Sequence, residues 1–158
     1  MSEKKKSSGC LSALIIAFII MVILAVLGWV SYVGFTVGAN RHAAKNIYAE
    51  IVKYSEDEIK KCNIGNDTFM DTLKCPAEPK KIIKKLLETY SETINPFTFN
   101  ENTLTGKYIL KNNIDISKDS NIGFININFT DQNIVFEQCF DKPCKDSLNQ
   151  SKSSLKIR

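Results

Sequence analysis

The sequence predicts an α+β fold in which a long N-terminal membrane-spanning helix continues into an amphipathic stem. The stem is expected to pack on a small antiparallel sheet, with one short helix added. Three observations support this prediction. Residues 11–39 contain no charged side chain, residues 40–62 keep a helical spacing of apolar side chains, and segments between residues 107 and 140 alternate apolar with polar side chains. The 158-residue length is that of one ordinary domain.

Residues 10–39 predict a transmembrane helix. Its first part, from Leu11, reads LSALIIAFIIMVILAVL, in which Ser12 is the only polar side chain. About 20 apolar residues span the ~30 Å hydrocarbon core of a bilayer, and Trp29 and Tyr32 stand where an interfacial aromatic belt is expected. A buried core helix is the alternative, but the rest of the chain has little apolar mass to surround it. A cleaved secretory signal fits less well, because this apolar run exceeds the usual 7–15 residues.

The charges around the apolar segment predict its orientation. Lysines at positions 4–6 precede it, whereas Arg41 and Lys45 follow it. The positive-inside rule therefore favours a cytoplasmic basic tail or leader at residues 1–9 and an extracytoplasmic globular α+β domain at residues 63–144. We expect this domain to be anchored in the inner membrane of a bacterial cell envelope.

Five cysteines divide into one near the N-terminus, Cys10, and an even set in the polar part: Cys62, Cys75, Cys139 and Cys144. Disulfides persist outside the reducing cytosol, which agrees with the predicted orientation. Four cysteines allow three pairings, and the short separations favour Cys62 with Cys75 and Cys139 with Cys144. A zinc site is the alternative use of four cysteines, but an exported domain rarely keeps structural thiolates.

The amphipathic stem, residues 40–62, is predicted by apolar side chains that recur at three- and four-residue steps: Ala44, Ile47, Ile51 and Tyr54. No proline lies between Leu11 and Cys62, so we expect one helix of about 50 residues, near 75 Å long at the standard rise. The helix should stop at Cys62–Gly65, where Asn63 and Gly65 are suited to a left-handed C-terminal cap.

The remaining elements follow from local patterns. The segment PKKIIKKLLETYSETI from Pro79 predicts a short amphipathic helix that ends before Asn95 and Pro96, with its lysines on a solvated face. Alternating patterns predict three strands, at residues 107–116, 123–129 and 133–140, with a tight turn at TDQN between the last two. The polar C-terminal tail, residues 145–158, is expected to be frayed.

Composition argues against several functions. His42 is the only histidine and there is no glycine-rich phosphate loop, so we expect neither an enzyme nor a bound metal or cofactor. The net charge of +4 is small, and the sequence shows no clustered basic face, so no nucleic-acid partner is predicted. The membrane is the expected partner.

This layout resembles a type IV pilin or a related pseudopilin. The lysines at positions 4–6 and Gly9 resemble a prepilin leader that is cut after Gly9, so that Cys10 becomes the mature N-terminus. Cys139 and Cys144 resemble the cysteines that close a C-terminal loop on the pilin sheet. Further similar positions lie at the membrane exit and in the stem: Tyr32, Phe35, residues 41–45 and EIKKC from Glu58. The resemblance implies processing by a prepilin peptidase, a pilus assembly machinery, other pilin-like subunits as partners and an extracellular or periplasmic filament.

Two positions depart from the pilin pattern. Leu14 stands at the fifth mature position, where pilins carry a Glu that neutralises the N-terminal amine of a neighbouring subunit, and Cys10 replaces the usual aromatic residue. Burying that amine without a carboxylate costs several kcal/mol, so the resemblance implies a minor or divergent subunit. The alternative is an uncleaved, single-pass membrane-anchored envelope protein whose outer domain binds a partner. The sequence leaves open whether the leader is cleaved, and whether the role is adhesion, motility, DNA uptake or secretion.

Overall fold

A computed structural model describes residues 7–65, 67–99 and 105–157, with side chains from Ser12 onward. The chain forms two compact units, Met1–Ala39 and Asn40–Arg158. The α+β fold class is confirmed, because one long helix and one short helix are combined with small sheets.

The first unit consists of the N-terminal part of helix α1 (Ser7–Asn63). Its described side chains are mostly apolar and exposed, and an 18-residue window of this segment has no buried residue. By length and composition, α1 is able to cross a membrane. The burial of this window that a core helix would require is not observed.

The second unit begins with the stem, which is the part of α1 from Asn40 to Asn63. Its buried side chains follow the helical period: Ala44, Tyr48, Ile51, Ser55 and Ile59. The helix ends with Lys60 and Lys61 in its last turn, and Gly65 has a φ of 103°, a left-handed conformation that favours glycine. The predicted end of the helix is confirmed.

The stem packs on a four-stranded sheet with the order β3-β4-β5-β6: β3 (Leu110–Asn112), β4 (Ile125–Thr130), β5 (Asn133–Cys139) and β6 (Gln150–Lys156). Strands β4, β5 and β6 are antiparallel, whereas β3 pairs parallel with β4, so the sheet is mixed and not wholly antiparallel as expected. The predicted strand at 107–116 is also shorter, because Tyr108 pairs with Ile94 instead and Asn113 has a φ of 58°.

Strand β6 corrects the expectation of a frayed tail. It pairs with the whole of β5, from Asn133 with Lys156 to Cys139 with Gln150. Its inward side is fixed further by Tyr48 of the stem, whose hydroxyl donates to the Phe136 carbonyl oxygen at 3.2 Å and is hydrogen-bonded to Ser153 Oγ at 2.9 Å. The segment is polar, yet pairing with a buried neighbour makes it a strand.

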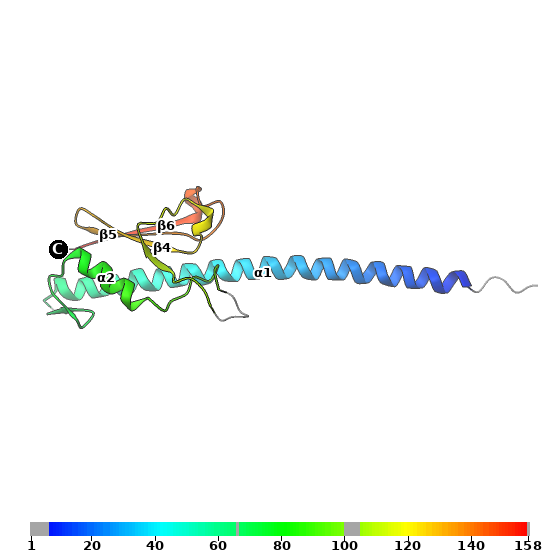
Figure 1. Cartoon of the computed structure of the whole chain (residues 1–158), viewed down its shortest axis with the longest axis horizontal. Helices are drawn as coiled ribbons and strands as arrows, with labels where there is room; N and C mark the ends of the chain where they lie inside the picture. The colour runs from blue at the N-terminus through cyan, green and yellow to red at the C-terminus, as the bar shows by residue number, and fades with distance from the viewer. Residues whose placement is uncertain (1–6, 66, 100–104, 158) are drawn as a thin grey trace, which may run out of the picture. The chain divides into compact units, whose positions relative to one another are not determined.

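Helix α2 (Pro79–Thr89) confirms the predicted short helix, although it ends at Thr89 rather than near Ile94. It buries Ile82, Ile83 and Leu86 and leaves most of its lysines exposed. A small hairpin, β1 (Thr68–Phe69) with β2 (Leu73–Lys74), joins α1 to α2. Figure 1 shows the sheet alongside the stem, and α2 near the end of α1. The common core includes seven fully buried side chains: Ile51, Ile82, Leu86, Ile125, Ile127, Ile134 and Phe136.

Candidate functional site

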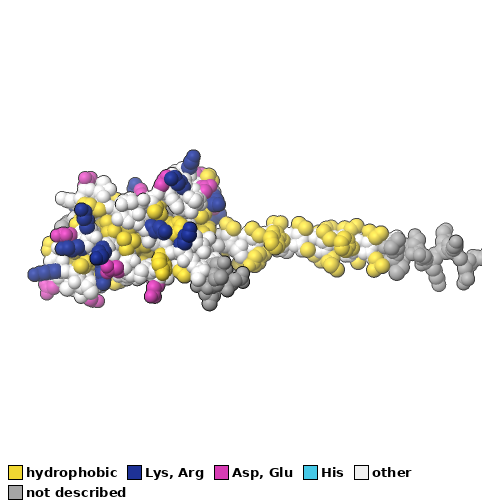
Figure 2. Space-filling view, in the orientation of Figure 1, with side chains coloured by type: hydrophobic (Ala, Val, Ile, Leu, Met, Phe, Trp, Pro, Cys, Tyr) yellow, Lys and Arg dark blue, Asp and Glu magenta, His cyan; other side chains and the backbone are white. Residues whose placement is uncertain are grey.

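The first candidate region is the apolar surface of α1 in the first unit. Its large side chains are all well exposed: Leu14, Ile15, Ile16, Phe18, Ile19, Ile20, Met21, Leu24, Leu27, Trp29, Tyr32 and Phe35. Figure 2 shows groups of hydrophobic side chains, in yellow, along the whole described length of this helix segment. By length and composition, a bilayer could cover this surface.

Three predicted positions fall at the start of this helix. Gly9 and Cys10 lie within the helical bounds of α1, but their side chains are outside the described residues, so cleavage between them stays a prediction. Leu14, the position of the missing pilin Glu, is 62% exposed. No carboxylate accompanies it in the described part of the helix up to Ala39.

The second candidate region contains two disulfides. One joins Cys62 at the end of α1 to Cys75 after β2, and the other joins Cys139 at the end of β5 to Cys144. These are the pairings that the short separations favoured. Each of these four cysteine sulfurs is therefore part of a disulfide. None of the four remains as a thiolate for the alternative zinc site.

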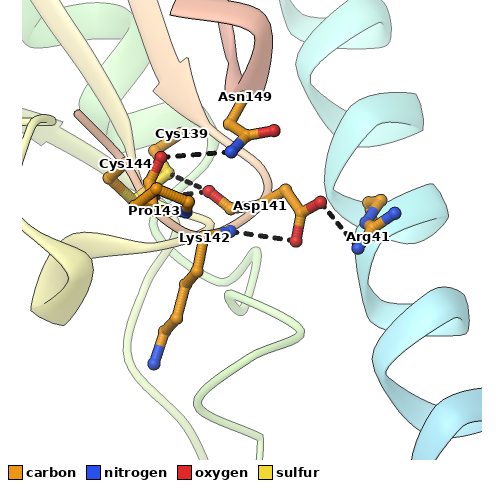
Figure 3. Close-up of polar contacts among 7 residues, drawn as sticks. All are labelled: Arg41, Cys139, Asp141, Lys142, Pro143, Cys144 and Asn149. Carbon is orange, nitrogen blue, oxygen red and sulfur yellow. Dashed lines mark hydrogen bonds and ion pairs between the residues drawn. A yellow bond between two sulfur atoms is a disulfide. The ribbon is translucent and has the colours of Figure 1, made fainter. Parts of the chain in front are cut away.

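The second disulfide closes what we name the C-terminal loop, residues 139–150. Within it, the Phe140 amide donates to Asn149 O at 3.0 Å, and Asn149 Nδ2 donates to Pro143 O at 3.1 Å. Gln150 Nε2 donates to Cys144 O at 2.5 Å. These bonds and the disulfide connect the two sides of the loop, and Figure 3 shows the disulfide together with the bond from Asn149.

Two contacts attach the C-terminal loop to the first turns of the stem. Arg41 Nη2 lies 2.6 Å from Asp141 Oδ2, and the ammonium of Lys45 lies 3.8 Å from the centroid of the Phe140 ring (Figure 3 shows the first contact). The other Asp141 oxygen accepts from the Lys142 amide at 2.9 Å. Sequence reasoning missed this attachment, although one signal was present: Arg41 is one of only two arginines in a lysine-rich chain.

At the other end of the stem, Glu58 is a buried acid, with 5% of its surface exposed. It accepts from the Met70 amide at 2.7 Å and from Lys61 Nζ at 2.5 Å. Burial raises the pKa of this carboxyl, but the hydrogen bonds from Lys61 and Met70 together with the Lys61 charge outweigh burial, so its pKa is lowered. Sequence analysis placed Glu58 in the stem without assigning it a partner.

An open groove of about 590 Å³ lies beside the first disulfide. Its lining includes Thr72, Lys74, Pro76, Glu78 and Lys81, and Lys81 pairs with Glu78 at 3.4 Å. These side chains supply no nucleophile with an adjacent base, so the groove has no arrangement for covalent catalysis.

The fold and these regions define a class of protein: an exposed apolar helix followed by a disulfide-bonded α+β unit. The chain matches no family model, and neither a curated protein nor a solved structure is significantly similar to it.

Proposed function

We propose that this protein is a non-catalytic, type IV pilin-like subunit of the minor kind, which belongs to a membrane-assembled filament. One observation carries the proposal: helix α1 joins an exposed apolar half to a stem that packs on a small sheet with a disulfide-closed C-terminal loop. A subunit of this layout is stored in the membrane through its apolar half. It enters a filament when this apolar half leaves the lipid and packs against the helices of neighbouring subunits.

The mechanism is physical. Head-to-tail contacts between apolar helices that do not close into a ring produce a helical filament, and the outer units form its surface. Leu14 supplies no carboxylate for the N-terminal amine of a subunit next to it in the filament. A subunit at the filament tip avoids the free-energy cost of burying an unpaired amine, because no subunit lies beyond it.

A second candidate is an uncleaved, single-pass anchor in the inner membrane, with a cytoplasmic N-terminus and an outer unit that binds an envelope partner. Leu14 and Cys10 favour it, since an anchor that is never cut needs neither the pilin Glu nor an aromatic residue after the cut. Both candidates share the membrane helix and the two disulfides.

The discriminating experiment is the intact mass and N-terminal sequence of the protein purified from its native membranes without reductant. The pilin-like proposal predicts a chain that begins at Cys10. A Gly9→Leu variant should remain uncut, because the resemblance implies that the peptidase requires the small residue at this position, whereas the matched variant Ser8→Ala should be cut normally.

A chain that still begins at Met1 or Ser2 in wild type would overturn the pilin-like proposal and support the uncleaved anchor. In either case, a mass four hydrogens below that of the reduced chain checks both disulfides.

A further inference from the structure

We propose that the C-terminal loop and the first turns of the stem bind anionic phospholipid headgroups of the membrane that holds α1. This inference rests on the membrane anchorage in the proposed function, but not on filament assembly. It assigns a ligand to the surface formed by Arg41, Lys45, Lys142, Lys145 and Leu148.

Covalent connection keeps this surface near the end of the uncharged segment. Arg41 and Lys45 follow the last residue of the uncharged segment, Ala39, by two and six residues, which is about 3 to 9 Å along a helix. The C-terminal loop contacts both residues, through Asp141 and Phe140. The loop therefore contacts side chains that follow the uncharged segment within a few residues of the sequence.

The basic groups of this surface are available for phosphate. Lys142 and Lys145 are exposed and form no ion pair in the described part of the chain, and Figure 3 shows the Lys142 side chain extending away from Arg41. Phosphate oxygens accept hydrogen bonds and carry negative charge, which suits these donors.

The nearby acidic groups are already engaged. Asp141 pairs with Arg41, Asp119 accepts from the Cys144 amide at 2.7 Å, and Asp146 accepts from the Leu148 amide at 2.9 Å. Each of these bonds stabilises the loop. The acids therefore hold the shape of the surface. Only Asp141 is paired with a cation, so Asp119 and Asp146 keep their negative charge, and the basic side chains Lys45, Lys142 and Lys145 outnumber them.

Leu148 adds an apolar contact. It lies in a short 3₁₀ turn, Ser147–Asn149, and is 82% exposed, although its neighbours are polar. Leu148 follows Lys145 by three residues, so it supplies an apolar group near a basic one, a combination that suits the headgroup level of a bilayer. Ile64 is equally exposed, at 81%, but it follows the last residue of α1, about 36 Å along the helix from Asn40.

Ile64 therefore provides a matched control for a test with the whole chain in lipid nanodiscs. In a Trp29→Phe background, Leu148→Trp and Ile64→Trp each introduce a single indole, whose quenching by brominated lipid chains reports contact with the bilayer. We expect quenching for the substitution at position 148 and none for the substitution at position 64. Equal quenching at both positions, or none at position 148, would overturn the inference.

The recognition of charge is tested by comparing nanodiscs of phosphatidylcholine with nanodiscs that also contain phosphatidylglycerol. We expect residues 141–149 to gain protection from hydrogen exchange in the anionic discs, and to lose this gain in the Lys142→Gln/Lys145→Gln variant. The control variant Lys80→Gln/Lys84→Gln on α2 should keep the gain. High salt should also abolish it, because the screening length falls to about 3 Å at 1 M.

Two further outcomes are distinguishable. If wild-type Trp29 is not quenched by brominated lipid, the membrane anchorage fails and the inference fails with it. If Trp29 is quenched but the loop gains exchange protection without quenching at position 148, protein rather than lipid covers the loop. That result overturns the inference and leaves the anchor intact.

Discussion

The carboxylate of Glu58, on the stem, accepts a hydrogen bond from the backbone amide of Met70 at 2.7 Å. This bond connects α1 to the turn between β1 and β2, where Met70 and Asp71 have φ values of 49° and 56°. Non-glycine residues adopt this left-handed conformation only when their surroundings hold them there. Glu58 therefore helps to fix the hairpin that precedes α2.

Replacing Glu58 tests this connection. Glu58→Ala leaves the buried Met70 amide unsatisfied. We therefore expect the free energy of unfolding of the second unit, residues 40–158, to fall by about 1 to 3 kcal/mol. Glu58→Gln keeps an acceptor and should cost less. The control Glu56→Ala removes an exposed pair with Lys60 and should change stability by less than about 1 kcal/mol. Hydrogen exchange of the whole chain in detergent micelles measures each effect, and a larger effect for Glu56→Ala would contradict this role.

Glu58 also predicts a pH dependence. Although burial raises its pKa, the Lys61 and Met70 hydrogen bonds lower it overall, so the folded state binds this proton more weakly than the unfolded state. The contribution to stability is complete above the unfolded pKa of about 4.3 and is lost as the pH falls through the lower folded pKa. In Glu58→Gln, the acid-induced loss of stability in this range should be shallower than in wild type. Asp115 acts in the same direction through its hydrogen bonds with Ser117, so some slope should remain.

The local sequence pattern predicted both helices, because each lies in one continuous run of regularly spaced apolar side chains. The uncharged segment and the stem share one helical period, and α2 begins at Pro79 with apolar side chains at three- and four-residue steps. Strand pairing was harder to predict, since β3 pairs parallel with β4 and β6 is recruited by β5. In β6, Leu155 is the only large apolar side chain, so its sequence lacks a strand pattern.

The contacts of the candidate site also differ in how far the local sequence predicted them. The disulfides were predictable because each closes a short segment, of 13 and 5 residues in separation. The pair between Arg41 and Asp141 joins residues 100 positions apart, and the bond from Met70 to Glu58 ends at a backbone amide. The rarity of arginine marks Arg41, but no local pattern names the partner in either contact, because tertiary packing alone brings the partners together.

Tyr48 is predicted to stabilise the attachment of the sheet to the stem. Tyr48→Phe removes the hydroxyl that bonds to the Phe136 carbonyl oxygen and to Ser153, so we expect a loss of about 0.5 to 1.5 kcal/mol. The control Tyr54→Phe alters a side chain that is 40% exposed and should have little effect. Exchange rates of the β5 and β6 amides measure the difference. Unchanged rates in Tyr48→Phe would show that these bonds add nothing to the net stability.

The two disulfides should contribute unequally. In the chain-entropy model, a link across 13 residues stabilises by about 3 kcal/mol and a link across 5 residues by about 2 kcal/mol. The double variant Cys62→Ser/Cys75→Ser should therefore destabilise the second unit more than the double variant Cys139→Ser/Cys144→Ser does. Urea unfolding, followed by near-UV circular dichroism of the tyrosines, tests the order. The reverse order would indicate that the C-terminal loop depends on its disulfide for folded-state contacts.

The last prediction concerns β6, which is paired on one side only, with β5. The Ile157 amide donates to Gln132 O and the Phe140 amide donates to Asn149 O, so these two residue pairs are hydrogen-bonded. Because bonded and non-bonded pairs alternate along an antiparallel ladder, Ser153 must point its amide toward β5, whereas Ser154 must point its amide away from the sheet.

Proline substitution separates these two positions. Ser153→Pro removes a ladder hydrogen bond and should unfold β6 from β5, whereas Ser154→Pro removes only an outward amide, which edge strands tolerate. We expect Ser153→Pro to lower the free energy of unfolding by at least about 1 kcal/mol, because the Phe136 carbonyl loses its ladder donor, and Ser154→Pro to lower it clearly less. Hydrogen exchange of the β5 amides should rise in Ser153→Pro alone. Equal effects would contradict the deduced ladder, and no effect from either variant would show that β6 does not hold the sheet together.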